Sequence, residues 1–175
     1  SLDGWQSDPS RWMSHEDAVA AYERNPALAG IGFVLTADLG IVGVDMDHVI
    51  DSDTGEIAEW AQDHVRDLDS YTEVSPSGRG FRTFLLGTLP DGCPHKAGHR
   101  EIYDRGRWLT ITGNVWHDAP IVARPAAVER YIAAMRKPRD ASAADVHTGA
   151  SSGIASNAAM IRSVLAGDNL HDSTR

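Results

Sequence analysis

Short apolar runs alternate with polar stretches along these 175 residues and predict both strands and helices. Compact apolar runs indicate strands at 31–36, 40–45, 70–74, 81–86, 100–103 and 107–112. Apolar residues at helical spacing predict helices at 12–24, 56–68 and 128–135, the first capped by Ser14. Tight turns favour two hairpins, one joining 31–36 to 40–45 and the other joining 100–103 to 107–112.

The pattern changes beyond residue 135. Residues 136–153 are rich in Lys, Arg, Pro, Ala, Ser, Asp and Gly, which predicts a linker. Residues 154–175 have helical spacing again but end before they could bury an apolar face. We therefore expect a compact domain at 1–135, a linker at 136–153, and the start of a helical domain at 154–175 in a fragment of a longer protein.

Two further features bound the setting of the protein. No apolar run approaches the roughly 20 residues that cross a bilayer, so we expect no membrane partner. Cys93 is the single cysteine, which excludes an internal disulfide framework and a cysteine-based zinc site. We expect a reducing, cytoplasmic location.

Charge is distributed unevenly around the net value of −9. Residues 1–73 hold 16 acidic and 3 basic residues, whereas residues 74–107 hold 6 basic and 3 acidic residues. A basic segment inside an acidic chain suits a phosphate-bearing substrate. Arginines exposed on an ordinary hairpin would give the same composition.

The first candidate site residues are Asp45 and Asp47, which follow the apolar run at 40–44. The period of two along a strand places both carboxylates on one face. Neighbouring carboxylates repel each other, and a divalent cation relieves that repulsion. The pair is a candidate metal site, although two solvated acids or an Asx turn would have the same sequence.

A glycine-rich turn follows in the basic segment. It offers the hydroxyls of Ser75 and Ser77, the flexible backbone of Gly78 and Gly80, and the guanidinium of Arg79. Backbone amides in such a turn can form an anion site, and arginine can clamp a phosphate. The turn lacks the lysine of a P-loop, and a plain hairpin turn would look much the same.

A third acid comes from the strand at 100–103. Glu101 shares a face with Tyr103, whereas Asp104 is expected to enter the following turn, so Glu101 is the favoured metal ligand and Asp104 the alternative. Thr112 ends the next predicted strand with a small polar group that could contact a sugar or phosphate.

Residues 1–135 resemble the primase–polymerase domain of phage and plasmid replication proteins, within the archaeo-eukaryotic primase superfamily. The first motif of that family resembles Val42-Gly43-Val44-Asp45-Met46-Asp47-His48. Its second motif resembles the segment 70–80, which ends in Ser75-Pro76-Ser77-Gly78-Arg79-Gly80, and its third resembles 101–107 followed by 110–113. The three motifs occur in order and with compatible spacing.

The resemblance implies an α/β (α+β) fold with an RRM-like mixed or antiparallel sheet flanked by helices. It implies a DNA primase–polymerase that makes and extends primers from dNTPs or NTPs on a single-stranded DNA template. It also implies Mg²⁺ or Mn²⁺ at a two-metal site formed by Asp45, Asp47 and Glu101. The tail from 154 resembles the start of a helical domain that commonly leads to a helicase in mobile-element replication proteins of bacterial hosts.

The chain departs from the family at Arg82, where the second motif usually has a histidine that contacts the nucleotide phosphates. Arginine still donates hydrogen bonds to phosphate but does not titrate near neutral pH. Two alternatives to a polymerase follow from the residues. One is a relative that binds nucleotide or DNA with weakened catalysis, and the other is a metal-dependent nuclease or phosphohydrolase.

Overall fold

The computed structural model describes residues 8–28 and 30–137, so the part of the expected linker beyond 137 and the whole helical segment at 154–175 lie outside the described residues. The elements run in the order η2 (Pro9–Arg11), α1 (His15–Arg24), β1 (Ile31–Leu35), η3 (Ala37–Leu39), β2 (Ile41–Met46), α2 (Glu59–Leu68), β3 (Thr72–Val74), β4 (Phe81–Leu86), β5 (Lys96–Ala97), β6 (Arg100–Tyr103), β7 (Arg107–Ile111), β8 (Val115–His117) and α3 (Pro125–Arg136). The expected α/β class is confirmed.

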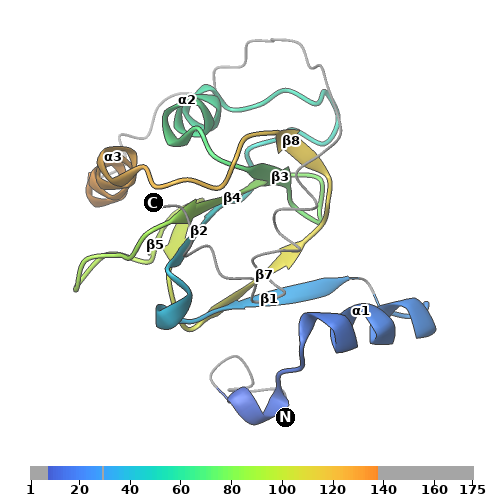
Figure 1. Ribbon diagram of the computed structural model, residues 1–175. Helices are drawn as coiled ribbons and strands as arrows, with labels where there is room; N and C mark the ends of the chain where they lie inside the picture. Colours follow the sequence, from blue (N-terminus) through green and yellow to red (C-terminus); the bar gives the residue numbers. More distant parts are fainter. Residues whose placement is uncertain (1–7, 29, 138–175) are drawn as a thin grey trace, which may run out of the picture.

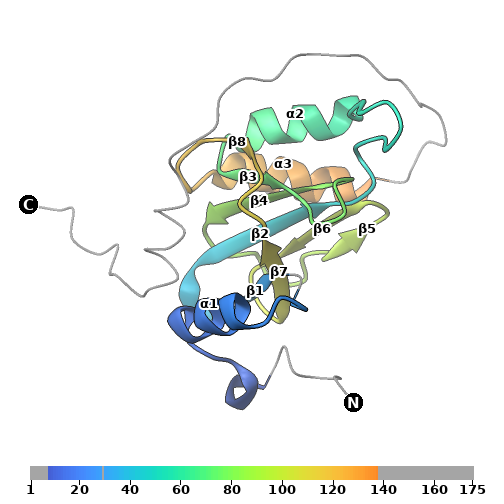
Figure 2. The same cartoon turned by 90° about the vertical axis from the view of Figure 1, so that its right-hand side faces the viewer.

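Three layers make up the described part of the chain (Figures 1 and 2). The middle layer is an antiparallel sheet with the strand order β5-β6-β2-β4-β3-β8. Helices α2 and α3 cover one face of this sheet, and the two-stranded ribbon of β1 and β7 lies over the other face. Helix α1 packs on the outer side of that ribbon. The division of the chain into domains at 135 and 153 stays a prediction.

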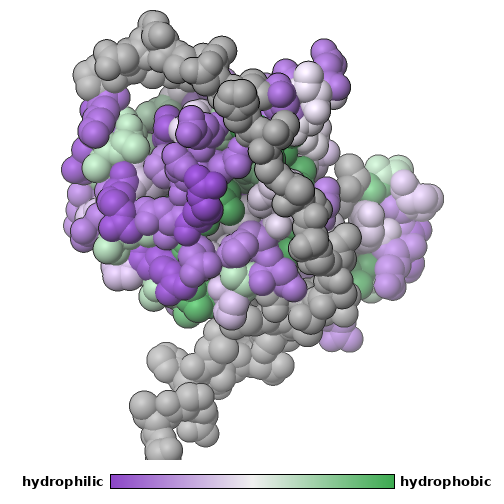
Figure 3. All heavy atoms as spheres, turned by 90° about the horizontal axis from the view of Figure 1, so that it is seen from above, coloured by the Kyte–Doolittle hydropathy of each residue, from purple (hydrophilic) through white to green (hydrophobic). Residues whose placement is uncertain are grey.

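Two apolar clusters hold the layers together. The larger cluster lies between the sheet and the helices and includes Val44, Met46, Phe81 and Ile102. The smaller cluster lies between the sheet and the ribbon and includes Leu35, Ile41, Phe84 and Leu109. The helix side of the molecule is otherwise mostly hydrophilic (Figure 3). Among the described residues, no helix is both long enough and apolar enough to cross a membrane.

The predicted hairpin between 31–36 and 40–45 is wrong. Strand β1 pairs with β7, whereas β2 pairs with β4 and β6. The connection η3 ends at Gly40 in the left-handed region, at φ 61°, which turns the chain from the ribbon into the sheet. Apolar strands can pair with any available edge, so sequence adjacency did not decide their partners.

The predicted hairpin between 100–103 and 107–112 is also wrong. Strand β6 enters the sheet beside β2, and β7 joins β1 in the ribbon. Gly106 adopts φ 64° and its amide donates to the Leu35 carbonyl at 3.1 Å, which directs the chain towards β1. Strands β3 and β4, predicted at 70–74 and 81–86, flank the glycine-rich turn and pair antiparallel.

The ends of several elements differ from the predicted boundaries. Ser14 caps α1 as expected, because its hydroxyl accepts from the Asp17 amide at 3.1 Å. Helix α2 begins at Glu59 rather than at 56, since Ile57 first forms a β-bridge with Ile50. The sequence did not predict strands β5 and β8, because strands of two and three residues carry no readable periodicity.

Candidate active site

Five charged side chains form a row across one face of the six-stranded sheet. Asp45 on β2 pairs directly with Arg82 on β4 and with Glu101 on β6. Glu73 on β3 continues the row beyond Arg82, and Lys96 on β5 continues it beyond Glu101. Directly opposed residues of antiparallel strands point to the same side of a sheet. These five residues, the charge row, therefore lie on the face opposite the helices.

Asp45 is the buried centre of this row. Its side chain is only 5% exposed, and Arg82 Nε contacts its Oδ1 at 3.4 Å. Burial raises the pKa of Asp45 to about 6; the Arg82 charge opposes this change, and the charges of Asp47 and Glu101 add to it. The ionised Asp45 is thus under-compensated by the protein alone.

Asp47 lies beyond the end of β2, beside the glycine-rich turn. Its amide donates to the His99 carbonyl at 2.9 Å. A Cβ atom placed on Gly80 would lie 3.4 Å from the Asp47 Cα and 2.5 Å from the Met46 carbonyl oxygen. Only glycine permits so close an approach. The structure therefore brings the second predicted acid next to the predicted phosphate turn.

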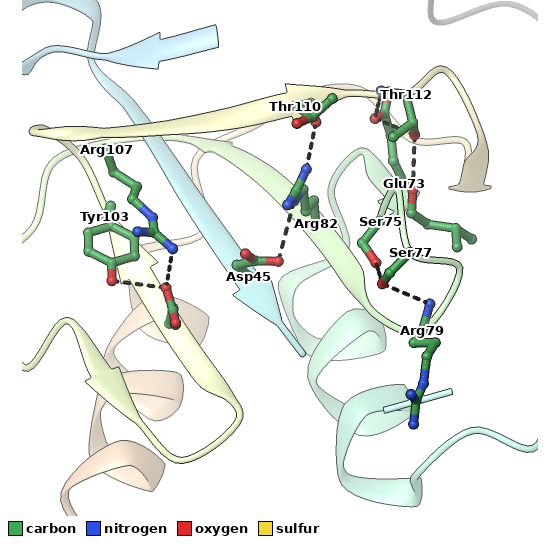
Figure 4. A network of polar contacts seen from close by, with 12 residues as sticks. Asp45, Glu73, Ser75, Ser77, Arg79, Arg82, Tyr103, Arg107, Thr110 and Thr112 are labelled. Atoms are coloured by element: carbon green, nitrogen blue, oxygen red, sulfur yellow. Dashed lines mark hydrogen bonds and ion pairs between the residues drawn. The ribbon is translucent and has the colours of Figure 1, made fainter. Parts of the chain in front are cut away.

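The turn itself joins β3 to β4. The Ser75 amide donates to the Gly80 carbonyl at 2.8 Å, and the Gly78 amide donates to the Ser75 carbonyl at 2.9 Å. The hydroxyls of Ser75 and Ser77 are 3.1 Å apart, and the Ser77 oxygen accepts from the Arg79 amide (Figure 4). Gly78 has φ 72°, a conformation that suits glycine. The exposed Ser77 and Arg79 side chains lie at the outer edge of this turn.

Arg82 bridges the sheet and the ribbon. Besides its contact with Asp45, it donates through a terminal nitrogen to the Thr110 carbonyl on β7 at 3.2 Å (Figure 4). Its side chain is largely buried, and it reaches across the sheet rather than towards the glycine-rich turn. The guanidinium thus lies where it neutralises Asp45.

Glu101 and Asp104 have different surroundings. Glu101 lies beside Asp45, and both of its oxygens accept hydrogen bonds, one from Lys96 and the other from Tyr103 and Arg107. Burial raises the pKa of Glu101, but these partners outweigh it and hold the pKa below its ordinary value. Asp104 instead caps the loop after β4, accepting from the Leu89 amide at 2.9 Å.

Glu73 is a site residue that the sequence did not single out. It is fully buried and accepts from the Tyr71 hydroxyl at 2.7 Å, from the Thr112 amide at 2.7 Å and hydroxyl at 2.9 Å, and from the Gly113 amide at 3.1 Å. It therefore fastens the end of β7 to the strand that leads into the glycine-rich turn. The sequence signal was an acid within a strand-like run, as for Glu101.

The acids fit a divalent cation by their chemistry rather than by a preformed cage. Among residues 8–28 and 30–137, no three His, Cys, Asp or Glu side chains converge as a metal cluster. Asp45 and Asp47 nevertheless supply the hard carboxylate oxygens that Mg²⁺ and Mn²⁺ prefer, and Asp45 lacks full charge compensation. Glu101 supplies the same kind of oxygen, and a cation there would compete with the hydrogen-bond donors that Glu101 now has.

A cavity of about 860 Å³ adjoins the glycine-rich turn. Ser75 and Gly78 of the turn and Thr112 and Asn114 after β7 line its polar end. The rest of the lining comes from α1, β1 and the residues beside them, and it mixes apolar side chains with polar ones: Met13, Tyr22, Leu28, Ile31, Phe33, Arg11, Ser14 and His15. Asp45, Asp47 and Glu101 are not among its lining residues, but Thr110, whose carbonyl accepts from Arg82, is.

Comparison with known proteins supports the motif assignment. No protein-family model matches the chain. Over 115 residues, 63% of its length, the chain is 40% identical to a protein of Nitratiruptor phage NrS-1 named DNA primase-polymerase. The chain spans only 16% of that relative. The resemblance to primase–polymerase proteins indicated by the three motifs is confirmed.

Proposed function

We propose that this chain carries a DNA primase–polymerase domain that transfers nucleotides from dNTPs or NTPs to a primer on a single-stranded DNA template. The observation that carries the proposal is the register of the central sheet. It aligns Glu101 with Asp45 on neighbouring strands, and Asp47 follows beside the glycine-rich turn, close enough for its charge to act on Asp45. Similarity to a protein named DNA primase-polymerase supports the same reaction.

Asp45, Asp47 and Glu101 would hold Mg²⁺ or Mn²⁺ in this site. When bound there, the cations would supply charge neutralisation for the transferred phosphoryl group and would lower the pKa of the attacking hydroxyl. The protein's own part is to fix three carboxylates on a rigid sheet, where β2 is buried on both faces. Such positioning is the main contribution that a protein makes to phosphoryl transfer.

The glycine-rich turn would bind the triphosphate. Ser77 and Arg79 present a hydroxyl and a guanidinium at its exposed edge, and Ser75, Gly78 and Gly80 give it its shape. Thr112 would help to hold the end of β7 beside the turn rather than bind phosphate, because its hydroxyl already bonds to Glu73 and to the Val74 carbonyl. Arg82 acts at Asp45 rather than directly on the phosphates in this conformation.

The cavity beside the turn suits the nucleoside part of the substrate. The polar groups at one end of the cavity belong to the turn or lie beside it. The rest of the lining mixes apolar and polar side chains, as is typical of small-molecule sites. A ligand with phosphates at one end and a planar base at the other matches this order of surfaces. We infer that the base and sugar occupy the space between α1 and β1.

Primer extension tests the proposal. The purified chain is incubated with a labelled primer on a DNA template, triphosphates and Mn²⁺ or Mg²⁺, and products are separated on a denaturing gel. We expect longer products with the wild type and none with Asp45→Ala/Asp47→Ala, whereas Asp38→Ala, an exposed acid on η3, keeps the activity. Extension that survives the double change would sink the proposal. Metal-dependent shortening of the primer without extension would identify a nuclease instead.

One observation favours a second candidate, a nucleotide- or DNA-binding relative with weakened catalysis. Arg82 already compensates part of the Asp45 charge that a cation would otherwise neutralise. On this reading, the triphosphate binds to the wild type and to Arg82→His, and neither variant incorporates it. Substantial synthesis by either protein contradicts this candidate.

A further inference from the structure

We propose that Lys96 is an internal counter-ion of Glu101 and competes with a divalent cation for this carboxylate. The inference rests on the proposed function, because it takes Glu101 as a metal ligand. It assigns to Lys96 a role in setting how tightly the site binds its cation. Lys96 is thus a positioning residue for the acids rather than a catalytic residue.

The contacts of Glu101 carry the first step. Lys96 Nζ donates a hydrogen bond to Oε1 of Glu101. The Tyr103 hydroxyl donates to Oε2 at 2.9 Å, and Arg107 donates to the same Oε2 at 2.8 Å. The Glu101 side chain is only 2% exposed, so water does not replace these donors easily. Oε1 accepts from Lys96 alone, whereas Oε2 accepts from two donors, so a cation that binds Glu101 together with Asp45 competes most directly with Lys96.

Lys96 is the donor that can leave. Its side chain is 62% exposed and extends from β5, a two-residue strand at the edge of the sheet. Arg107 is 37% exposed, and its guanidinium also lies over the Tyr103 ring at 5.0 Å. Lysine is a flexible point charge with a strongly hydrated head, whereas stacked arginine is held in place. Release of Lys96 therefore disturbs the site least.

Charge balance supports the same direction. The three acids Asp45, Asp47 and Glu101 have three bases within their reach, namely Lys96 and Arg107 at Glu101 and Arg82 at Asp45. These six side chains alone therefore carry three negative and three positive charges without a cation. A divalent ion adds two positive charges, and movement of one ammonium into solvent removes part of the resulting repulsion. Lys96 and the cation then compete for one carboxylate.

The experiment is a Mn²⁺ titration of the metal-free chain, in which electron paramagnetic resonance measures free Mn²⁺ at low ionic strength. Lys96→Met removes the charge and keeps the apolar stem, and Lys96→Arg keeps the charge. Lys137→Met is the matched control, because it removes the same charge from the exposed residue after α3. All proteins are compared with Asp45→Asn, which identifies the binding that depends on the proposed site.

We expect Lys96→Met to lower the Mn²⁺ dissociation constant roughly three- to tenfold, in the range of an ion pair with one buried partner. Lys96→Arg and Lys137→Met should remain within about twofold of the wild type on the same scale. Unchanged or weaker Mn²⁺ binding by Lys96→Met overturns the role of Lys96 alone. If the wild type shows no Asp45-dependent Mn²⁺ binding at all, the proposed metal site fails and the role of Lys96 fails with it.

Discussion

Replacement of Asp45 by asparagine is expected to stabilise the metal-free protein, although it removes a proposed metal ligand. The carboxyl group is buried at the centre of the charge row, and burial raises its pKa from 3.8 to about 6. An ionised group in such a place destabilises the folded state. Asparagine has nearly the same shape and never ionises, so the variant avoids this penalty.

The magnitude follows from the two pKa values. In the unfolded chain Asp45 ionises around pH 3.8, whereas in the folded protein it keeps its proton until about pH 6. Between these values the folded state binds more protons than the unfolded state, so the stability of the wild type falls as pH rises. Above pH 6 the accumulated penalty is about 3 kcal/mol, from 1.36 kcal/mol per pH unit.

Urea unfolding with EDTA, at pH values from 4 to 8, measures this difference. Asp45→Asn should match the wild type near pH 4, should gain stability progressively up to pH 6, and should stay about 2–3 kcal/mol more stable at pH 8. Added Mn²⁺ should then stabilise the wild type more than the variant, because ligands stabilise the state that binds them. A variant less stable than the wild type at pH 8 without metal would refute the reasoning.

Three other changes probe the remaining parts of the site. Glu73→Ala should lower the free energy of unfolding, measured in urea, by about 3–5 kcal/mol, because it leaves the Thr112 and Gly113 amides and the Tyr71 hydroxyl without their acceptor. A loss below about 1 kcal/mol would contradict the role of Glu73 in fastening the end of β7. Ala18→Trp, which fills the cavity, should weaken triphosphate binding about tenfold or more in calorimetry and leave Mn²⁺ binding unchanged. Glu16→Trp on the exposed side of α1 is its control. Equal triphosphate affinity of the two variants would place the nucleoside elsewhere. Arg82→His should tighten Mn²⁺ binding roughly three- to tenfold, because Asp45 loses a competing charge; no tightening would mean that Arg82 does not compete with the cation.

Much of the local structure could be predicted from the sequence. Capping of α1 by Ser14, the hairpin between β3 and β4, and the apolar strand before Asp45 all depend on residues close together in the chain. Such signals are written in spacing and turn chemistry. The face of the sheet on which Asp45 lies could be predicted from the period of two along a strand.

Strand partners could not be predicted in the same way. Both hairpin errors involved strands whose neighbours in the chain are not their neighbours in the sheet, β1 with β2 and β6 with β7. Several apolar edges were available to each strand, and only the packing of the whole domain selects among them. The charge row depends on those long-range pairings, so the sequence did not predict which residues form it.

The candidate site shows the same division. Asp45, Asp47 and the glycine-rich turn could be identified as candidates from local motifs. Glu101, which the sequence favoured over Asp104 as a metal ligand, lies opposite Asp45 in the sheet register, and its role as a ligand stays a prediction. Glu73 and Lys96 escaped notice because their meaning depends on partners 39 and 5 residues away across strands. A buried acid in a strand points to such a partner but does not name it.

The central claim is that a divalent cation on the acids and a triphosphate on the glycine-rich turn share one site. Calorimetric titration of the chain with a non-hydrolysable deoxynucleoside triphosphate, with and without Mn²⁺, tests it most directly. We predict that the wild type binds the analogue at least tenfold more tightly with Mn²⁺ and that Asp45→Asn/Asp47→Asn abolishes this gain. A gain of the same size in the double variant, or no gain in the wild type, would contradict the account.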